Sequence, residues 1–241
     1  MESSFSNLLI NRETLLIKIV NYVLRGGEQF NMVLLVPDDI PAGQNVTEGN
    51  VEEMRALYKD WDPRIPKLLS LCESVYKWRL CIRPGLEQWS HPSGAFILLG
   101  DAVHATLPYL ASGAGMSLED GAVLGELFAR QKGPFSPRRK KQLLDIYQKI
   151  RAERTETIVE RGNTQQYLYH LHDGLEQEER DRVTRAGEPG DALAWKDRGF
   201  APFLLGWRCE EEVDRLWKEE REDGGKVQSR LEYCDFLPVS V

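Results

Sequence analysis

The residue types best suited to chemistry lie in one window of the sequence, FILLGDAVHATLPYLASGAGMSLEDGAVLGELF at 96–128. An apolar run at 95–99 predicts a buried strand, and Gly100 and Asp101 follow at its carboxyl end, where α/β sheets bind ligands. The turn Gly113–Gly115 then opens a predicted helix, whose first N–H groups lack internal partners and attract negative charge. This layout suits a polar or anionic ligand that lies across a strand end and a helix start.

The same pattern also fits a plain connection between a strand and a helix, with an aspartate in its turn. A Gly-x-Gly sequence is a weak signal by itself, because glycine is common in tight turns. Spacing alone therefore leaves a ligand site and a simple connection as two open interpretations.

The elements that must position this window are predicted from hydrophobic periodicity and from turn residues. Upstream, we expect a hairpin of 20–24 with a buried strand 29–36, a polar loop 41–50, helices 51–61 and 65–71, and a strand 76–83. Asn50 or Thr47 is a possible cap for the first of these helices. Downstream, we expect helices at 117–131 and 138–172 and an irregular helical tail. The apolar stripe of the longer helix is formed by Leu143, Tyr147, Ile150 and Ile158.

Composition excludes several classes of protein. The 241 residues carry a net charge of −7 with basic and acidic residues mixed, which argues against nucleic acid as a partner. No run approaches the roughly 20 apolar residues of a membrane span, and no signal peptide is expected at the N-terminus. The four cysteines show no CxxC pairing, so we expect free thiols and a cytoplasmic location.

Several fixed residue types at fixed spacing carry a family resemblance. They are Gly100-Asp101-Ala102-Val103-His104, Pro108, Gly113-Ala114-Gly115 and Glu119-Asp120. This set resembles the second FAD-binding motif of the group A flavoprotein monooxygenases, the family of salicylate hydroxylase and para-hydroxybenzoate hydroxylase. RGGEQFNMVLLVPDD, WDPRIPKLLSL and WSHPSG also resemble its fungal salicylate-hydroxylase-like branch. The likeness extends from about Val20 to the C-terminus and is strongest at 22–130.

The resemblance implies an α/β fold, and more narrowly an α+β fragment that corresponds to the C-terminal half of the family's chain. It implies a partial Rossmann-like FAD-binding domain, a remnant of a substrate β-sheet and a helical C-terminal region. On that basis we expect three parts. Residues 1–90 would be the remaining substrate sheet with an atypical N-terminus, 91–135 the FAD-binding segment, and 136–241 the helical region.

Roles for single residues also follow from the resemblance. Asp101 would bind the ribityl or ribose hydroxyls of FAD, because a carboxylate offers only acceptors. Gly113, Ala114 and Gly115 would direct backbone N–H groups toward the flavin ring, and Pro108 would shape the loop beside its reacting face. No metal is expected. The implied activity is hydroxylation of a phenolic or polyketide-like aromatic with NAD(P)H and molecular oxygen, in fungal-type secondary metabolism.

The sequence departs from the family pattern in four places. Ala105 stands where the family often has Pro, and Ser112 where it often has Gln. No GxGxxG is present, and residues 1–19 do not resemble the family. An alternative start, an error in delimiting the coding sequence or a true truncation would each produce this. A non-catalytic remnant or interaction protein that cannot hold FAD is thus the second hypothesis, and an unrelated α+β binding module the third.

Other polar residues are given structural interpretations. We expect His104 to be a hydrogen-bonded structural histidine, and Glu119 and Asp120 to complement the dipole of a helix's first turn. His170 and His172 are two residues apart on a predicted helix and share no face, which argues against a metal site. Packing at a domain junction is favoured over a substrate channel for four residues: Trp78, Arg79, Arg83 and Trp89.

Overall fold

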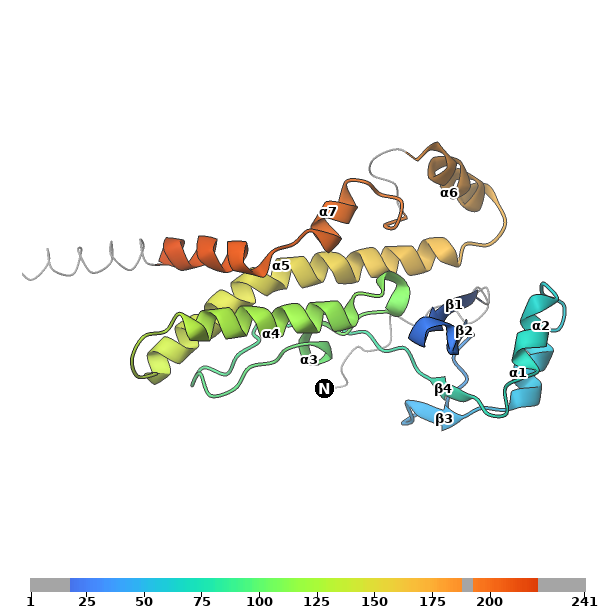
Figure 1. Ribbon diagram of the computed structural model, residues 1–241, viewed down its shortest axis with the longest axis horizontal. Helices are drawn as coiled ribbons and strands as arrows, with labels where there is room; N and C mark the ends of the chain where they lie inside the picture. Colours follow the sequence, from blue (N-terminus) through green and yellow to red (C-terminus); the bar gives the residue numbers. More distant parts are fainter. Residues whose placement is uncertain (1–17, 188–192, 221–241) are drawn as a thin grey trace, which may run out of the picture. The chain divides into compact units, whose positions relative to one another are not determined.

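A computed structural model describes residues 18–187 and 193–220 of the chain (Figure 1). These residues divide into two compact units. Unit 1 contains 18–81 and 170–172, and unit 2 contains 82–169 together with the described residues from 173 onward. The whole 96–128 window therefore lies in unit 2.

Unit 1 begins with the predicted hairpin. β1 (Lys18–Leu24) pairs antiparallel with β2 (Gln29–Leu35), and a 3-10 turn, η1 (Arg25–Gly27), joins them. The hairpin is confirmed, but the expectation of a buried second strand is wrong, because Phe30 is 48% exposed and the rest of β2 is at most half-buried. Its apolar sequence forms a two-stranded sheet within the described residues, and such a sheet has few neighbours to cover it.

A second small sheet lies where a loop is predicted. β3 (Val46–Glu48) pairs antiparallel with β4 (Tyr76–Trp78), with Thr47 opposite Lys77. The prediction of a polar loop at 41–50 is therefore wrong for residues 46–48, and the strand expected at 76–83 ends at Trp78. The pairing joins segments about thirty residues apart, and a period-2 pattern in three residues is too short to reveal it.

Two short helices complete unit 1. They are α1 (Val51–Leu57) and α2 (Arg64–Leu69), each shorter than predicted. Asn50 caps α1 as expected, since its Oδ1 accepts from the amides of Glu52 at 2.8 Å and Glu53 at 3.1 Å. The small core of the unit consists of Met54, Tyr58 and Leu69.

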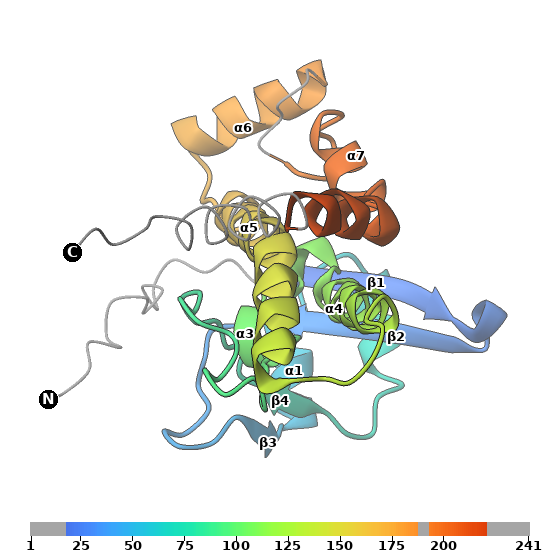
Figure 2. The same cartoon turned by 90° about the vertical axis from the view of Figure 1, so that its left-hand side faces the viewer.

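Unit 2 is mainly helical. In chain order it contains α3 (Asp101–His104), η2 (Pro108–Leu110), α4 (Gly113–Ala129), α5 (Pro137–Tyr169), α6 (Leu175–Ala186), α7 (Phe200–Leu205) and a helical stretch at 209–220. Figures 1 and 2 show α4 packed along the long helix α5. Within the described part of the chain, no helix is both long and apolar enough to cross a membrane.

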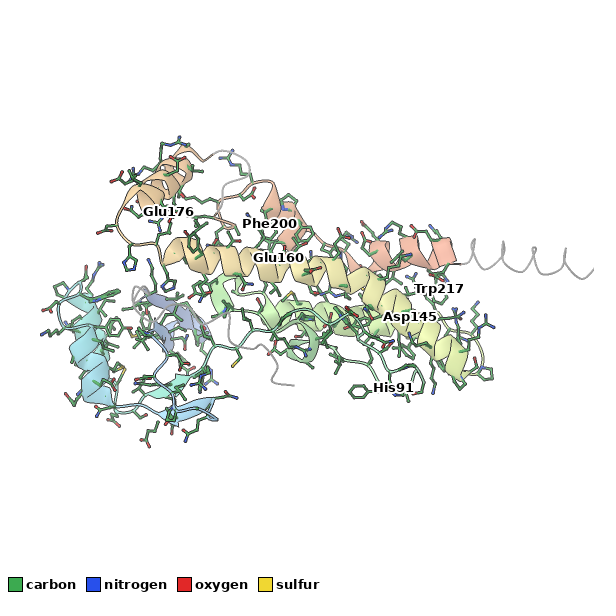
Figure 3. The ribbon with its side chains drawn as sticks, turned by 180° about the vertical axis from the view of Figure 1, so that it is seen from behind. His91, Asp145, Glu160, Glu176, Phe200 and Trp217 are labelled. Carbon is green, nitrogen blue, oxygen red and sulfur yellow. The ribbon has the colours of Figure 1, made fainter. Side chains whose placement is uncertain are left out.

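The predicted apolar stripe of α5 forms the core of unit 2. Its residues Leu143, Tyr147 and Ile150 pack against Val123 and Leu127 of α4. Ile158 belongs to a second cluster, which also contains Phe200 of α7. Figure 3 shows Phe200 beside α5, where Arg161 stacks over its ring at 4.8 Å. The stripe is therefore confirmed along its length.

Two predictions for the segment before α4 are wrong. Residues 95–99 form no regular strand, because the described residues give this segment one isolated bridge, between Ser90 and Ile97, and leave Phe96 60% exposed. An apolar run shows the tendency to extend, but a strand also needs a partner along its length. The helix expected at 117–131 begins earlier, so Gly113–Gly115 forms its first turn instead of preceding it.

Candidate functional site

A hollow of about 390 Å³ opens at the start of α4 in unit 2. This volume falls within the range of small-molecule sites. Its lining residues come from α3, the loop after it, and the first turns of α4: Asp101, Thr106, Pro108, Ala111, Ser112, Gly113, Ala114 and Ser117. Four of the five predicted site residues thus line one hollow, and Gly115 lies in the same helical turn without lining it.

Asp101 is held at one wall of this hollow by an unusual backbone turn. Gly100 has φ 58° and ψ −145°, which L-residues with a side chain rarely adopt, and a Cβ there would lie 2.9 Å from Ser117 Oγ. The turn lets Asp101 begin α3 with an exposed side chain. The carboxylate therefore faces solvent from a one-turn helix, and not from the end of a regular strand as predicted.

The loop between α3 and α4 is anchored from below. Pro108 is exposed and begins η2, while the next two residues, Tyr109 and Leu110, are buried. The backbone oxygen of Tyr109 accepts from Trp195 Nε1 at 3.2 Å. A proline at the rim above two buried side chains gives the hollow a rigid edge.

The start of α4 presents free backbone donors. Its first helical bond runs from the Met116 amide to the Ser112 oxygen at 2.8 Å. The Ser112 hydroxyl donates to the Leu110 oxygen at 2.7 Å and does not cap the helix. Among the described residues, no protein group accepts from the amides of Gly113–Gly115. These donors and the helix dipole make this end of the hollow attractive to negative charge.

Beneath the hollow lies a buried carboxylate, Asp120, which is 0% exposed. It accepts from the Gly100 amide at 2.8 Å and from Arg151 Nε at 2.8 Å, and it lies 2.7 Å from His104 Nε2. Burial acts to raise the pKa of Asp120, but the hydrogen bonds from His104, Gly100 and Arg151 outweigh it and hold that pKa below its ordinary value. Asp120 is therefore a structural anion beneath the turn that carries Asp101.

This arrangement corrects one prediction and confirms another. Glu119 and Asp120 do not complement the dipole of a first turn, because α4 begins at Gly113 and places both residues in its second turn. His104 is buried and bonded to Asp120, so its structural interpretation is confirmed.

Two arginines of α5 were missed by the sequence reasoning. Arg151 is fully buried and pairs with Glu119 as well as Asp120, at 2.6 and 2.8 Å. Arg154 makes two further bonds to Glu119, at 2.8 and 2.7 Å. A signal was present, since the two arginines follow the stripe residues Tyr147 and Ile150 by four positions and so occupy the same buried face.

The remaining residues singled out in the sequence have separate surroundings. Trp89 is buried against Tyr147, which confirms its packing role, whereas Trp78 is 73% exposed. Arg79 pairs with Asp38 at 2.8 Å within unit 1. The described residues contain no group of three or more His, Cys, Asp and Glu side chains that would hold a metal ion.

Comparison with known proteins finds a family model that matches the segment carrying this site. The FAD binding domain family matches residues 87–162, which include α3, the hollow and α4. The chain is 40% identical over 191 residues to the FAD-dependent monooxygenase OpS4 of Beauveria bassiana, covering 78% of this chain and 44% of that relative. It is 34% identical to 3-hydroxybenzoate 6-hydroxylase 2 of Aquipseudomonas alcaligenes, covering 80% and 56%. The chain spans about half the length of the curated relatives that it matches.

Solved structures share the fold. FqzB matches with a TM-score of 0.63 and 19% identity over 84% of this chain and 45% of its own. A variant of Klebsiella pneumoniae HpxO, complexed with FAD, matches with a TM-score of 0.59 and 22% identity, covering 78% of this chain and 46% of its own. The expected α/β fragment of a flavoprotein hydroxylase fold is confirmed. Over most of its length the chain is therefore similar to FAD-dependent monooxygenases and hydroxylases, and its residues 87–162 match the FAD binding domain family.

Proposed function

We propose that this chain forms the flavin-binding side of a monooxygenase that hydroxylates an aromatic ring with FAD, NAD(P)H and molecular oxygen. The observation that carries the proposal is the hollow at the start of α4, where Asp101, Pro108, Gly113 and Ala114 gather within the matched FAD binding domain.

The donors and acceptors of the hollow fit this cofactor. The exposed Asp101 carboxylate offers only acceptors, which suits adjacent hydroxyl groups such as those of a ribityl chain. The free amides of Gly113–Gly115 suit an electron-rich, carbonyl-bearing ring edge. The wall with Asp101 therefore suits a polyol, and the wall with the amides of Gly113–Gly115 suits a group that becomes negatively charged. FAD carries both kinds of group.

Each residue then has a defined task. Asp101 would hold the ribityl hydroxyls of FAD. The amides at the start of α4 would stabilise negative charge on the ring system. Pro108 keeps the loop rigid at the rim, and the buried Tyr109 and Leu110 hold it down. When bound, FAD supplies the transfer of electrons from NAD(P)H and the activation of oxygen, which no side chain here provides.

For the substrate we propose a phenolic or polyketide-like aromatic, in secondary metabolism. Its support comes from relatives named for aromatic substrates, which include 3-hydroxybenzoate 6-hydroxylase 2 and the hispidin-3-hydroxylase of Neonothopanus nambi. A cytoplasmic location is supported by the free thiols of Cys72, Cys81 and Cys209. Cys234 lies outside the described residues.

The test measures the affinity of an Asp101→Ala variant for FAD. Flavin absorbance and fluorescence are recorded while FAD is titrated into the 241-residue chain. Loss of a charged hydrogen bond should weaken binding by about 1–3 kcal/mol. Asp173→Ala, which removes an exposed carboxylate of the same charge from another part of unit 2, is the matched control and should bind like the wild type. Equal affinity of the Asp101→Ala variant and the wild type contradicts the assignment. A folded wild-type chain without affinity for FAD favours the non-catalytic scaffold.

A further inference from the structure

One oxygen atom of Asp120 holds both ends of α3. Oδ2 accepts from the amide of Gly100, the residue that precedes α3, and lies 2.7 Å from Nε2 of His104, the residue that ends it. Oδ1 is held separately by Arg151 Nε at 2.8 Å. The side chain of Asp120 is 0% exposed, so no water competes for these bonds.

A helix of one turn cannot hold its own conformation in water, because nucleation costs more than its few internal bonds return. The orientation of α3 therefore depends on other elements, through the packing of Val103 in the core of unit 2 and through bonds at its two ends. Gly100 adds to this dependence, because its positive φ must be maintained for Asp101 to begin the helix. Asp120 contacts this turn at the residue directly before Asp101.

We infer that Asp120 is the positioning residue for the flavin site, because it clamps both ends of α3 and so presents the Asp101 carboxylate to the hollow. This inference rests on the proposed function, because positioning Asp101 matters only if the hollow binds FAD. We call the bonds from Asp120 to Gly100 and His104 the clamp. Asp120 itself does not line the hollow and acts through Gly100 and His104.

The clamp is separable from the packing of α4 on α5. Arg151 also contacts the Glu119 carboxylate at 2.6 Å and the Met116 oxygen at 3.2 Å, and neither contact involves Asp120. An amide at position 120 has one accepting oxygen, so it cannot accept from Gly100 on one side and from Arg151 on the other. The Arg151 guanidinium offers only donors and should draw the amide oxygen, which turns the NH₂ group toward the Gly100 amide. Asp120→Asn should therefore release α3 while the two helices stay together.

The experiment compares Asp120→Asn with Leu127→Ala, a core truncation two turns further along α4 that leaves both bonds of Asp120 to α3 in place. Two quantities are measured in the full chain, at a temperature where all variants are fully folded. They are the FAD dissociation constant and the hydrogen exchange rate of the Gly100 amide without FAD. His104→Leu, which removes only the second tie, is a further variant in case Asp120→Asn does not fold.

We expect Asp120→Asn to weaken FAD binding by about fivefold to fiftyfold, because a misplaced ligand group costs much of its affinity. Gly100 exchange should become at least about tenfold faster in the same variant. His104→Leu should change FAD binding in the same direction. Leu127→Ala should lower the unfolding temperature and leave both quantities within about twofold of the wild type.

The inference is overturned if Asp120→Asn behaves like Leu127→Ala in FAD affinity, or if its Gly100 exchange matches the wild type. A wild-type chain that leaves FAD unbound overturns the proposed function instead. Gly100 exchange in the FAD-free variants then decides whether Asp120 holds α3, and so separates the two failures.

Discussion

Unit 1 and unit 2 bury their side chains in different ways. Unit 1 has a small core of Met54, Tyr58 and Leu69, and its hairpin leaves Tyr22 and Phe30 about half exposed. Unit 2 has two apolar clusters along α5 and a buried network of two arginines with Glu119 and Asp120. The candidate site lies in the unit with the deeper interior. A carboxylate and a row of amides can face one hollow only if the backbone beneath them is fixed.

The largest expected effect comes from breaking the buried ionic network. Arg151→Met should destabilise unit 2 by about 3–5 kcal/mol, because it leaves buried carboxylate charge without its partner. The free energy of unfolding is read from hydrogen exchange of α5 amides, and exchange in β1 and β2 should stay unchanged. The control is Arg215→Met, which removes exposed ion pairs worth about 0–1 kcal/mol. A similarly small loss of unfolding free energy in both variants would show that the buried network does not stabilise unit 2.

A pair of core truncations sharpens the comparison further. Leu143→Ala in unit 2 and Leu69→Ala in unit 1 each remove a buried side chain that is at most 1% exposed, and each should cost about 2–5 kcal/mol. The losses should appear in different units when exchange is measured residue by residue. If either variant raises exchange equally in both, the two units unfold as one.

A smaller effect is expected at the start of α1 in unit 1. Asn50→Ala removes the acceptor for the amides of Glu52 and Glu53 and should cost about 1 kcal/mol. A urea titration followed by exchange in α1 measures this, and Asn50→Ser, which can still cap, is the control. An Ala variant as stable as the wild type would show that the cap contributes nothing.

The smallest effect concerns thiol chemistry and leaves stability unchanged. Burial, with nearby Glu210 and Glu126, raises the pKa of Cys209 in unit 2 to about 11. At pH 8 its thiolate fraction is about a hundredfold below that of a thiol with the ordinary pKa of 9.0. Iodoacetamide should therefore label Cys81, which is exposed in unit 1, well before Cys209. The rate of Cys209 labelling should increase with pH up to about pH 11. Mass spectrometry of timed samples measures both rates, and equal labelling rates for Cys81 and Cys209 would contradict the prediction.

Sequence patterns predicted the residues of the hollow better than the bonds that support them. Asp101, Pro108 and the Gly113–Gly115 turn lie close together along the chain, so turn residues and a helix start were enough to group them. The pairing of Asp120 with Arg151 joins α4 to α5 across 31 positions, and its register depends on how the helices pack. Glu119 and Asp120 were interpreted as complements of a helix dipole, because a single sequence does not show that Arg151 and Arg154 are buried with them.

The strand prediction at 95–99 and the loop prediction at 41–50 failed for a related reason. The run at 95–99 has the composition of a strand, but only a partner strand makes it one, and a single sequence does not show partners. β3 is the opposite case, a polar segment that becomes a strand because β4 pairs with it. Long helices such as α5 were predicted well, because their hydrogen bonds are local and their apolar stripe repeats many times.

The most direct test of the central claim is the hydrogen-exchange footprint of FAD on the wild-type chain. We predict slower exchange at Gly100 and Asp101 and at the amides of Gly113–Gly115, with α6 and the β1–β2 hairpin unchanged. Protection confined to those two segments would show that the cofactor binds across the α3 turn and the start of α4. Protection elsewhere, or none at FAD concentrations that saturate flavoproteins, would contradict the account.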